Sequence, residues 1–278
     1  MNDPTLVPQD ALARRRIALS VSESADLATL GLSERHCRLV VAEVTRAILL
    51  AGGTVVYGGR LEPEGYTRVL LDEIQRFKEG TASIEIVLAE PEFRNTSAEK
   101  LNAINQRLGT LGRLRLVDHR GVELSLRDKS RPADDFSAAD AYTAMRRFVA
   151  SVTSARIVVG GQLAGFEGSE PGVIEEARLS LEAGAELYIA GGYGGAAALL
   201  VTAVRGHTPG WMPQDFPRHA ADPSVQSALD RFRMVNAMKA GGNALSATDA
   251  RVLEASHRPG DIATTVTRAL AASGPGRE

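Results

Sequence analysis

Short, continuous apolar segments alternate with amphipathic segments through the first three quarters of the chain. Such apolar segments predict buried strands, because both faces of a parallel sheet are covered; they lie at residues 17–21, 54–57, 84–88, 114–117, 156–159 and 187–190. Apolar residues at helical spacing predict helices between them, at residues 33–51, 66–77, 138–152, 173–183 and 196–204. This alternation predicts a Rossmann-like α/β fold, a parallel sheet with helices on both faces.

Three local signals refine this pattern. Thr96 and Glu99 have the spacing of a capping box and predict the start of a further helix. Residues 122–126 are expected to extend the fourth strand as a hairpin. Residues 205–220 hold three prolines and the only tryptophan, which predicts a long loop. Long ordered loops are often functional.

The chain divides into three expected parts. Residues 1–15 form an N-terminal tail, and residues 16–220 form the α/β domain. Residues 221–278 form a C-terminal helical extension that packs on the same domain. Within this extension, apolar spacing predicts helices near residues 225–240 and 262–272.

Composition excludes several classes of protein. The 32 Lys+Arg and 34 Asp+Glu give a formal net charge of -2 over 278 residues, so no global charge attracts nucleic acid or an acidic membrane. The single cysteine, Cys37, excludes an internal disulfide framework and a multi-cysteine zinc site. The five histidines have no metal-ligand spacing, and no Gly-Lys pair forms a P-loop, so we expect neither a metal nor a cofactor.

The location of the protein is also an expectation from sequence. The first residues hold no apolar stretch like that of a signal peptide, and no run of about 18 apolar residues occurs. One cysteine suits a reducing compartment. We therefore expect a cytoplasmic protein that does not span a membrane.

Glycine pairs follow three of the predicted strands: Gly58–Gly59, Gly160–Gly161 and Gly191–Gly192. The carboxyl ends of parallel strands meet at one edge of a sheet, where ligands bind. Glycine lets a ligand approach the backbone, and the following helix presents free N–H groups. The pairs predict a cleft for phosphate and ribose. Alternatively, they are only tight strand-to-helix turns.

Other groups near these strand ends are further candidate contacts. Ser20, Ser22 and Ser24 follow the first strand and either donate to phosphate or cap turns. Residues 192–197 match G-x-G-x-x-A, which includes Gly194 and Gly195. This is the last glycine loop and not the first, which disfavours a dehydrogenase. Tyr193 either stacks on a base or anchors the loop.

The sequence VYGG at residues 56–59 and the segment from Arg156 to Glu176 resemble the SLOG superfamily, the Rossmann-like group of the DNA-processing and LOG proteins. LOG enzymes carry VYGG, then an arginine-containing helix, then P-G-G-x-G-T-x-x-E. The resemblance covers about residues 15–200. It is closer to SLOG branches associated with bacterial conflict systems, which implies a nucleotide-derived ligand, a TIR or other effector protein as partner, and a homo-oligomer.

The resemblance also implies roles for individual residues. The first glycine loop, Gly58 and Gly59 with Gly65 beyond it, and the later pair, Gly160 and Gly161, would approach phosphate or sugar. Arg146 resembles the arginine that contacts phosphate or substrate. Glu175 best matches the motif glutamate that assists cleavage of an N-glycosidic bond, and Glu176 follows it. In an enzyme these two glutamates and Arg146 would be catalytic. Alternatively, Glu175 and Glu176 only favour the dipole of a helix, and Arg146 is a solvated helix residue.

The chain departs from the LOG pattern at two points. Residues 162–170 separate the Gly160–Gly161 pair from Pro171–Gly172, and Val173 or Ile174 replaces the motif threonine. We expect binding or sensing of an ADP-ribose-like or cyclic ADP-ribose-like signal in bacterial defence. The alternatives are a LOG-like N-glycoside hydrolase or transferase and an oligomerising scaffold with a vestigial pocket.

Overall fold

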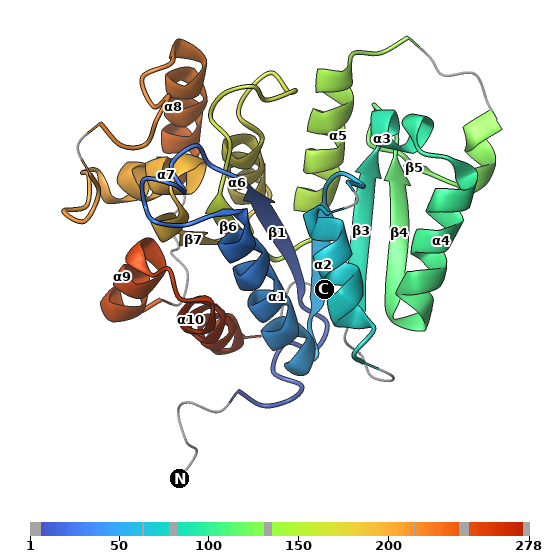
Figure 1. Cartoon of the computed structure of the whole chain (residues 1–278), viewed down its shortest axis with the longest axis horizontal. Coiled ribbons are helices and arrows are strands. Elements are labelled where there is room, and N and C mark those ends of the chain that lie inside the picture. The colour runs from blue at the N-terminus through green and yellow to red at the C-terminus, as the bar shows by residue number, and fades with distance from the viewer. Residues whose placement is uncertain are drawn as a thin grey trace.

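A seven-stranded sheet forms the centre of the protein in the computed structural model, which describes residues 7–62, 64–77, 83–130, 135–213, 215–238 and 245–274 (Figure 1). The strand order is β5-β4-β3-β2-β1-β6-β7. Every neighbouring pair is parallel except β4 and β5, which are antiparallel. The Rossmann-like α/β fold expected from the sequence is therefore confirmed.

The strands are β1 (Arg16–Ser22), β2 (Thr54–Gly58), β3 (Ser83–Ala89), β4 (Gly112–Val117), β5 (Glu123–Leu124), β6 (Ala155–Gly160) and β7 (Glu186–Ala190). The α-helices are α1 (Glu34–Leu50), α2 (Tyr66–Ile74), α3 (Glu90–Asn95), α4 (Ala98–Leu108), α5 (Ala138–Ser151), α6 (Gly172–Glu182), α7 (Gly195–Arg205), α8 (Pro223–Met238), α9 (Ala247–Ala255) and α10 (Pro259–Ala272).

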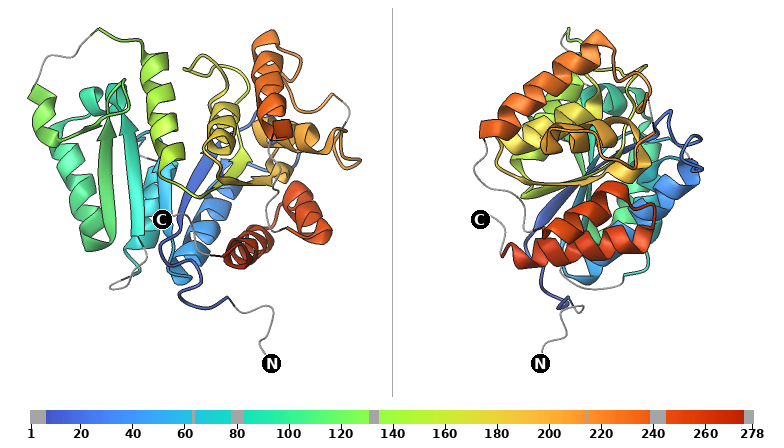
Figure 2. Two further views of the ribbon diagram at one scale, coloured as in Figure 1. Left: turned by 180° about the vertical axis from the view of Figure 1, so that it is seen from behind. Right: turned by 90° about the vertical axis from the view of Figure 1, so that its left-hand side faces the viewer.

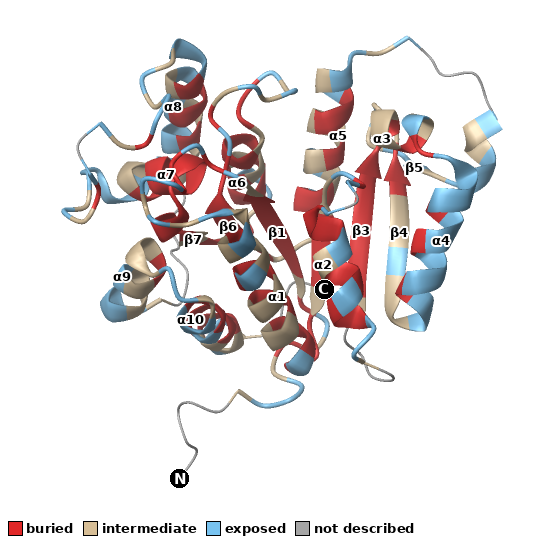
Figure 3. Ribbon diagram, in the orientation of Figure 1, coloured by how far each residue is buried: buried red, intermediate tan, exposed pale blue. Residues whose placement is uncertain are grey.

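Helices cover both faces of the sheet (Figures 1 and 2). Apolar residues of α1, α2, α4, α9 and α10 share one core cluster with Ile17, Leu19 and Val55. On the opposite face, α5 packs over Ala18 and Val56, while α6, α7 and α8 form a separate cluster. Because both faces are covered, most strand residues are buried, as Figure 3 shows, and this explains their continuous apolar sequence.

The C-terminal helices pack on the sheet domain. Helix α10 lies along α1 in Figures 1 and 2, and its Ile262, Val266 and Leu270 are buried in the shared core. The described part of the predicted N-terminal tail is also packed: Leu12 is buried, and buried Arg15 donates to the Glu186 carboxylate at 2.7 Å. No helix in the described parts of the chain has the length and apolarity needed to cross a membrane.

The predicted and observed elements differ in several places. Helix α4 begins at Ala98, and Ser97 caps it by accepting from the Lys100 N–H at 3.2 Å, so the predicted capping box was wrong. Thr96 instead ends α3, a short helix that the pattern did not predict. The hairpin beyond the fourth strand is confirmed as β5. Helix α9 was not predicted either, because its sequence buries only Leu253.

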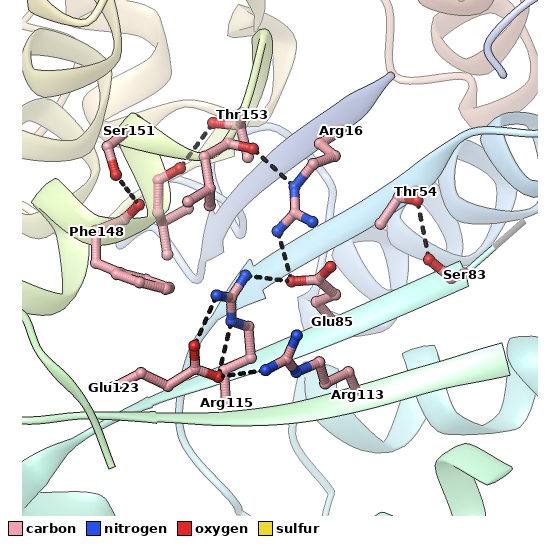
Figure 4. A network of polar contacts seen from close by, with 12 residues as sticks. Arg16, Thr54, Ser83, Glu85, Arg113, Arg115, Glu123, Phe148, Ser151 and Thr153 are labelled. Atoms are coloured by element: carbon pink, nitrogen blue, oxygen red, sulfur yellow. Dashed lines mark hydrogen bonds and ion pairs between the residues drawn. The ribbon is translucent and has the colours of Figure 1, made fainter. Parts of the chain in front are cut away.

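Charged residues cross the sheet obliquely, from Arg16 at the start of β1 to Glu123 opposite the end of β4 (Figure 4). Arg16 of β1 and Arg115 of β4 both donate to Glu85 of β3, at 2.6 and 3.1 Å. Arg115 also pairs with Glu123 of β5 at 2.8 Å, and its guanidinium lies 4.6 Å from the centre of the Phe148 ring. These paired charges link four strands on the α5 side of the sheet, and none of them lines the cleft described next.

Candidate functional site

A cleft of about 350 Å³ opens at the carboxyl edge of the sheet. From β1 the chain passes through α1 to β2, which lies on one side of β1 in the sheet. Strand β6 lies on the other side of β1, and from there the chain passes through α6 to β7, further in that direction. Such a reversal of strand order is the usual ligand site of open α/β sheets. The cleft is lined by the ends of β1, β2 and β3, the first residues of α2 and α6, and α5.

The first glycine loop lines this cleft. Gly58 and Gly59 end β2, and Gly65 is the N-cap of α2. A Cβ atom on Gly58 would lie 2.6 Å from the Met145 sulfur, and one on Gly59 would lie 2.2 Å from the Tyr57 ring. Close packing therefore requires glycine at both positions, in addition to any contact with a ligand.

Arg146 reaches the cleft from α5 and lies against the start of α6. A Cβ atom on Gly168 or Gly172 would lie 2.8 or 2.5 Å from its guanidinium nitrogens, so these glycines leave room for it. Its Nη1 pairs with the Glu175 carboxylate, and only 12% of its side chain is exposed. Arg146 thus places a fixed positive charge beside the free N–H groups of the first turn of α6.

The two glutamates of α6 point in different directions. Glu175 is 1% exposed, accepts from the Thr143 hydroxyl at 2.6 Å and from Arg146, and does not line the cleft. Glu176 lines the cleft and is 13% exposed. The motif G-T-x-x-E, counted from Gly172, ends at Glu176 rather than at Glu175. The spacing of this motif therefore indicates Glu176, the glutamate that faces the cleft.

The buried Arg156 fixes the position of the Glu176 carboxylate. Arg156 of β6 donates to Glu176 Oε2 at 3.0 Å, to the Ser20 hydroxyl and to the Ser180 hydroxyl, both at 2.6 Å. The Ser20 hydroxyl donates to the same carboxylate oxygen. Burial lowers the pKa of Arg156, and Glu176 partly offsets this. Arg156 was not predicted as a site residue, although a charge inside an apolar strand was the available signal.

Ser20 and Ser22 belong to β1 and only Ser24 follows it, and the three serines occupy different environments. Ser20 lies behind Glu176, whereas Ser22 lines the cleft and accepts from the Gln162 N–H at 3.0 Å. Ser24 lines a neighbouring cavity of about 210 Å³, and its hydroxyl donates to the Tyr193 carbonyl at 2.9 Å. The two cavities share Glu23 and Gln162.

The glycines after β6 and β7 are mostly used for packing. Gly161 and Gly195 line the second cavity, and the Gly195 N–H donates to the buried Asp26 carboxylate at 2.8 Å. Gly160 and Gly194 line neither cavity. Gly160 has φ +62°, and a Cβ there would lie 2.6 Å from the Ser22 carbonyl.

The loop after β7 is covered by the end of α9 and the residues that follow it. A Cβ atom on Gly191 would lie 2.8 Å from the Glu254 carbonyl, and one on Gly192 would lie 2.6 Å from the Ser256 carbonyl. Tyr193 is completely buried, and its hydroxyl donates to the His257 carbonyl at 3.1 Å. The structure therefore does not bring Gly191, Gly192 or Tyr193 to either cavity.

Charged residues that the sequence pattern did not single out also line the cleft: Glu23, Glu34, Arg60, Glu62 and Glu167. Arg60 pairs with Glu167 at 2.6 Å and thereby joins the loop after β2 to the loop before α6. The pKa of Glu23 is raised by burial and then by the neighbouring Glu34 carboxylate. No cluster of three or more metal-ligating side chains occurs in the part of the chain that the structure describes.

Glu23→Gln is expected to stabilise the protein at pH 7. A carboxyl group whose pKa is raised in the folded state destabilises that state once it is ionised, as the pH rises above about 4.5. Because Glu23 is an exposed residue, the expected rise in Tm is about 1 °C. Thermal unfolding at pH 7 and pH 3.5 measures it, and the difference should disappear at the lower pH. The control is Glu43→Gln, since Glu43 pairs with Arg46. An unchanged or lower Tm for Glu23→Gln at pH 7 would contradict the expectation.

The sheet order, the covered faces and a glycine-edged cleft at the reversal of strand order define a Rossmann-like protein with a small-molecule site. The family model described as SLOG cluster2 matches residues 11–240, and the chain therefore belongs to the SLOG family. This membership indicates a function in the binding or processing of nucleotides. No curated protein matches the chain.

Proposed function

We propose that the protein binds a nucleotide derivative in the cleft at the carboxyl edge of the sheet. The observation that carries the proposal is the meeting of two helix N-termini, those of α2 and α6, with Arg146 at one cavity. The first-turn N–H groups of a helix have no intrahelical partner and favour an anion. A guanidinium adds bidentate hydrogen bonding to phosphate.

The size of the cavities supports a nucleotide as ligand. The main cleft, at about 350 Å³, lies at the lower end of the range of about 300–1,000 Å³ for small-molecule sites. The second cavity adjoins it at Glu23 and Gln162 and adds about 210 Å³. A ligand that occupies both would be an ADP-ribose-like or cyclic ADP-ribose-like molecule, and one that occupies the main cleft alone would be a mononucleotide.

The proposed biological setting is a bacterial defence or signalling system. There the protein acts as a sensor, in the cytoplasm, as a homo-oligomer, and in concert with a TIR-domain or other effector protein. The support for this setting is the resemblance of the VYGG and EPGVIEEA segments to SLOG branches of that kind. Light scattering with and without ligand distinguishes a ligand-dependent assembly from a passive scaffold.

A thermal-shift panel tests binding directly. The compounds are ADP-ribose, cyclic ADP-ribose isomers, NAD, AMP and CMP. A ligand at 100 times its Kd stabilises the folded state by about 2.7 kcal/mol, which raises Tm by about 5 °C for a chain of this size. The absence of a shift with every compound, on well-folded protein, would count against the proposal.

A second candidate function is hydrolysis or transfer at an N-glycosidic bond. The observation that favours it is the fixed carboxylate of Glu176, which lines the cleft and is held by Ser20 and Arg156. A carboxylate beside the ribose would stabilise an oxocarbenium-like centre. The test is release of free base from AMP, CMP or NAD by the native chain, Glu176→Gln and Glu175→Gln.

The two glutamate variants have different expected results in an enzyme. Glu176→Gln should lower kcat by at least 100-fold, because it removes the charge that faces the cleft. Glu175→Gln should lower kcat less, because Glu175 contacts Arg146 and Thr143 and not the cleft. Full turnover by Glu176→Gln would exclude this mechanism. If the native chain releases no base, the enzymatic function is excluded and the proposal of binding alone stands.

A further inference from the structure

From the distribution of charge in the cleft, we infer that it selects a nucleotide whose base carries a positive charge, such as an N-ribosylated pyridinium, over one with a neutral base. This inference rests on the proposed function and names the ligand class of the same site. It follows from three observations: carboxylates gathered toward one side of the cleft, an excess of carboxylates over guanidinium groups in its lining, and a buried tyrosine hydroxyl with no strong hydrogen-bond partner.

The two sides of the cleft belong to opposite faces of the sheet. Helices α1 and α2 cover one face and contribute Glu34 and Tyr66. Helices α5 and α6 cover the other face and contribute Arg146, Glu176 and the N-terminus of α6. Glu23 follows β1 and Glu62 precedes α2. The α5–α6 side of the cleft therefore holds both a guanidinium and a carboxylate, whereas Glu23, Glu34 and Glu62 gather toward the α1–α2 side, where a cation is favoured.

Carboxylates outnumber guanidinium groups around the cleft. Its lining holds two arginines, Arg60 and Arg146, against five glutamates: Glu23, Glu34, Glu62, Glu167 and Glu176. Both arginines are already paired with carboxylates, at Glu167 and Glu175. A phosphate with a neutral base would bring only negative charge to this site. A zwitterionic nucleotide would place its phosphate and its cationic ring on opposite sides.

Few positive charges of the protein lie close to the carboxylates on the α1–α2 side of the cleft. Glu34 pairs with Arg38 at 2.8 Å, and Glu62 lies 3.8 Å from Arg60. Glu23 has no ion pair within the described parts of the chain, and its pKa is raised by burial, by its contact with the Glu34 carboxyl and by Glu62, whereas Arg38 lowers it. A cation held here would relieve this repulsion.

Tyr66 is the independent observation on the same side. It lines the cleft and is only 8% exposed, and its hydroxyl is buried with no hydrogen-bond partner among the described residues. The group nearest to it in this respect is the Cys37 thiol, and a thiol is a weak hydrogen-bond partner. A buried hydroxyl without a partner is costly, and a polar substituent on a bound base would satisfy it. Tyr57, 6% exposed, adds a second aromatic ring to the lining, and aromatic rings attract cations.

The test compares two nucleotides that differ mainly in ring charge. Nicotinamide mononucleotide has a cationic pyridinium ring, and its dihydro form has a neutral ring with the same ribose, phosphate and carboxamide. Titration calorimetry of the full chain should show at least tenfold tighter binding of the oxidised form. In Glu23→Gln/Glu34→Gln, affinity for the oxidised form should fall until the ratio approaches one. Glu43→Gln, on the outer part of α1, should keep the native ratio.

The outcomes separate this inference from the proposed function. Equal or tighter binding of the dihydro form, or of AMP, would overturn the inference while nucleotide binding stands. A ratio unchanged by the Glu23→Gln/Glu34→Gln substitution would also overturn it. No binding of nicotinamide mononucleotide, its dihydro form, AMP or ADP-ribose by folded protein would overturn the proposed function itself.

Discussion

Arg156→Met is expected to lower the free energy of unfolding by about 3 kcal/mol. Arg156 is 1% exposed and joins Glu176, Ser20 and Ser180 across β1, β6 and α6. Its removal leaves a carboxylate and two hydroxyls without their shared donor, and breaking a buried ion pair from one side costs about 3–5 kcal/mol. The lower end of this range applies because Glu176 lines the cleft and its carboxylate also lies 3.7 Å from the Arg146 guanidinium. Urea denaturation measures the change.

Two further variants control for this effect. Arg156→Met/Glu176→Gln removes the stranded charge and should recover part of the loss. Arg147→Met changes an exposed arginine on α5 and should alter the free energy of unfolding by less than about 0.5 kcal/mol. A loss below about 1 kcal/mol for Arg156→Met would show that the network is not needed for stability.

Arg146→Ala is expected to have two separate effects. Loss of a charged hydrogen bond to phosphate should weaken nucleotide binding by about 1.5–3 kcal/mol, or roughly 10- to 150-fold. Because Glu175 is 1% exposed and pairs with Arg146, the substitution also leaves a buried carboxylate without its cation, at a cost of about 3–5 kcal/mol in stability. Calorimetric titration and urea denaturation measure the two effects.

A second substitution separates binding from stability. Arg146→Ala/Glu175→Gln removes the buried charge and should recover much of the stability, whereas nucleotide affinity should stay low. If affinity returns together with stability, Arg146 acts only as the partner of Glu175 and does not contact the ligand. Arg147→Met again serves as the matched control, because this neighbouring arginine is exposed and does not line the cleft.

Part of the candidate site could be predicted from sequence. Gly58, Gly59, Gly65 and Arg146 line the cleft, as their positions after a strand or within a motif suggested. Gly191 and Gly192 follow a strand in the same way, yet the carbonyls of Glu254 and Ser256, more than sixty residues further along the chain, pack against them. Glycines that accommodate packing and glycines that face a ligand have the same local sequence signal.

The choice between Glu175 and Glu176 shows a second limit. Adjacent residues of a helix point about 100° apart, so only one of the two can face the cleft. The position of α6 against α5 turns Glu175 toward Arg146 and Thr143 and leaves Glu176 beside Ser20 and Arg156. This depends on how the two helices pack, which their separate sequences do not specify.

The sequence by itself determined the order of the strands, most of the helices between them and the class of fold, because parallel strands covered on both faces need continuous apolar residues. It also determined which strand ends carry glycine. Only the tertiary structure decided which of those ends stay open, which glutamate faces the cleft, and that Glu23, Glu34 and Glu62 gather toward one side of it while Arg146 and Glu176 share the other. Those properties arise between segments far apart in the chain, where packing places side chains that no local pattern relates.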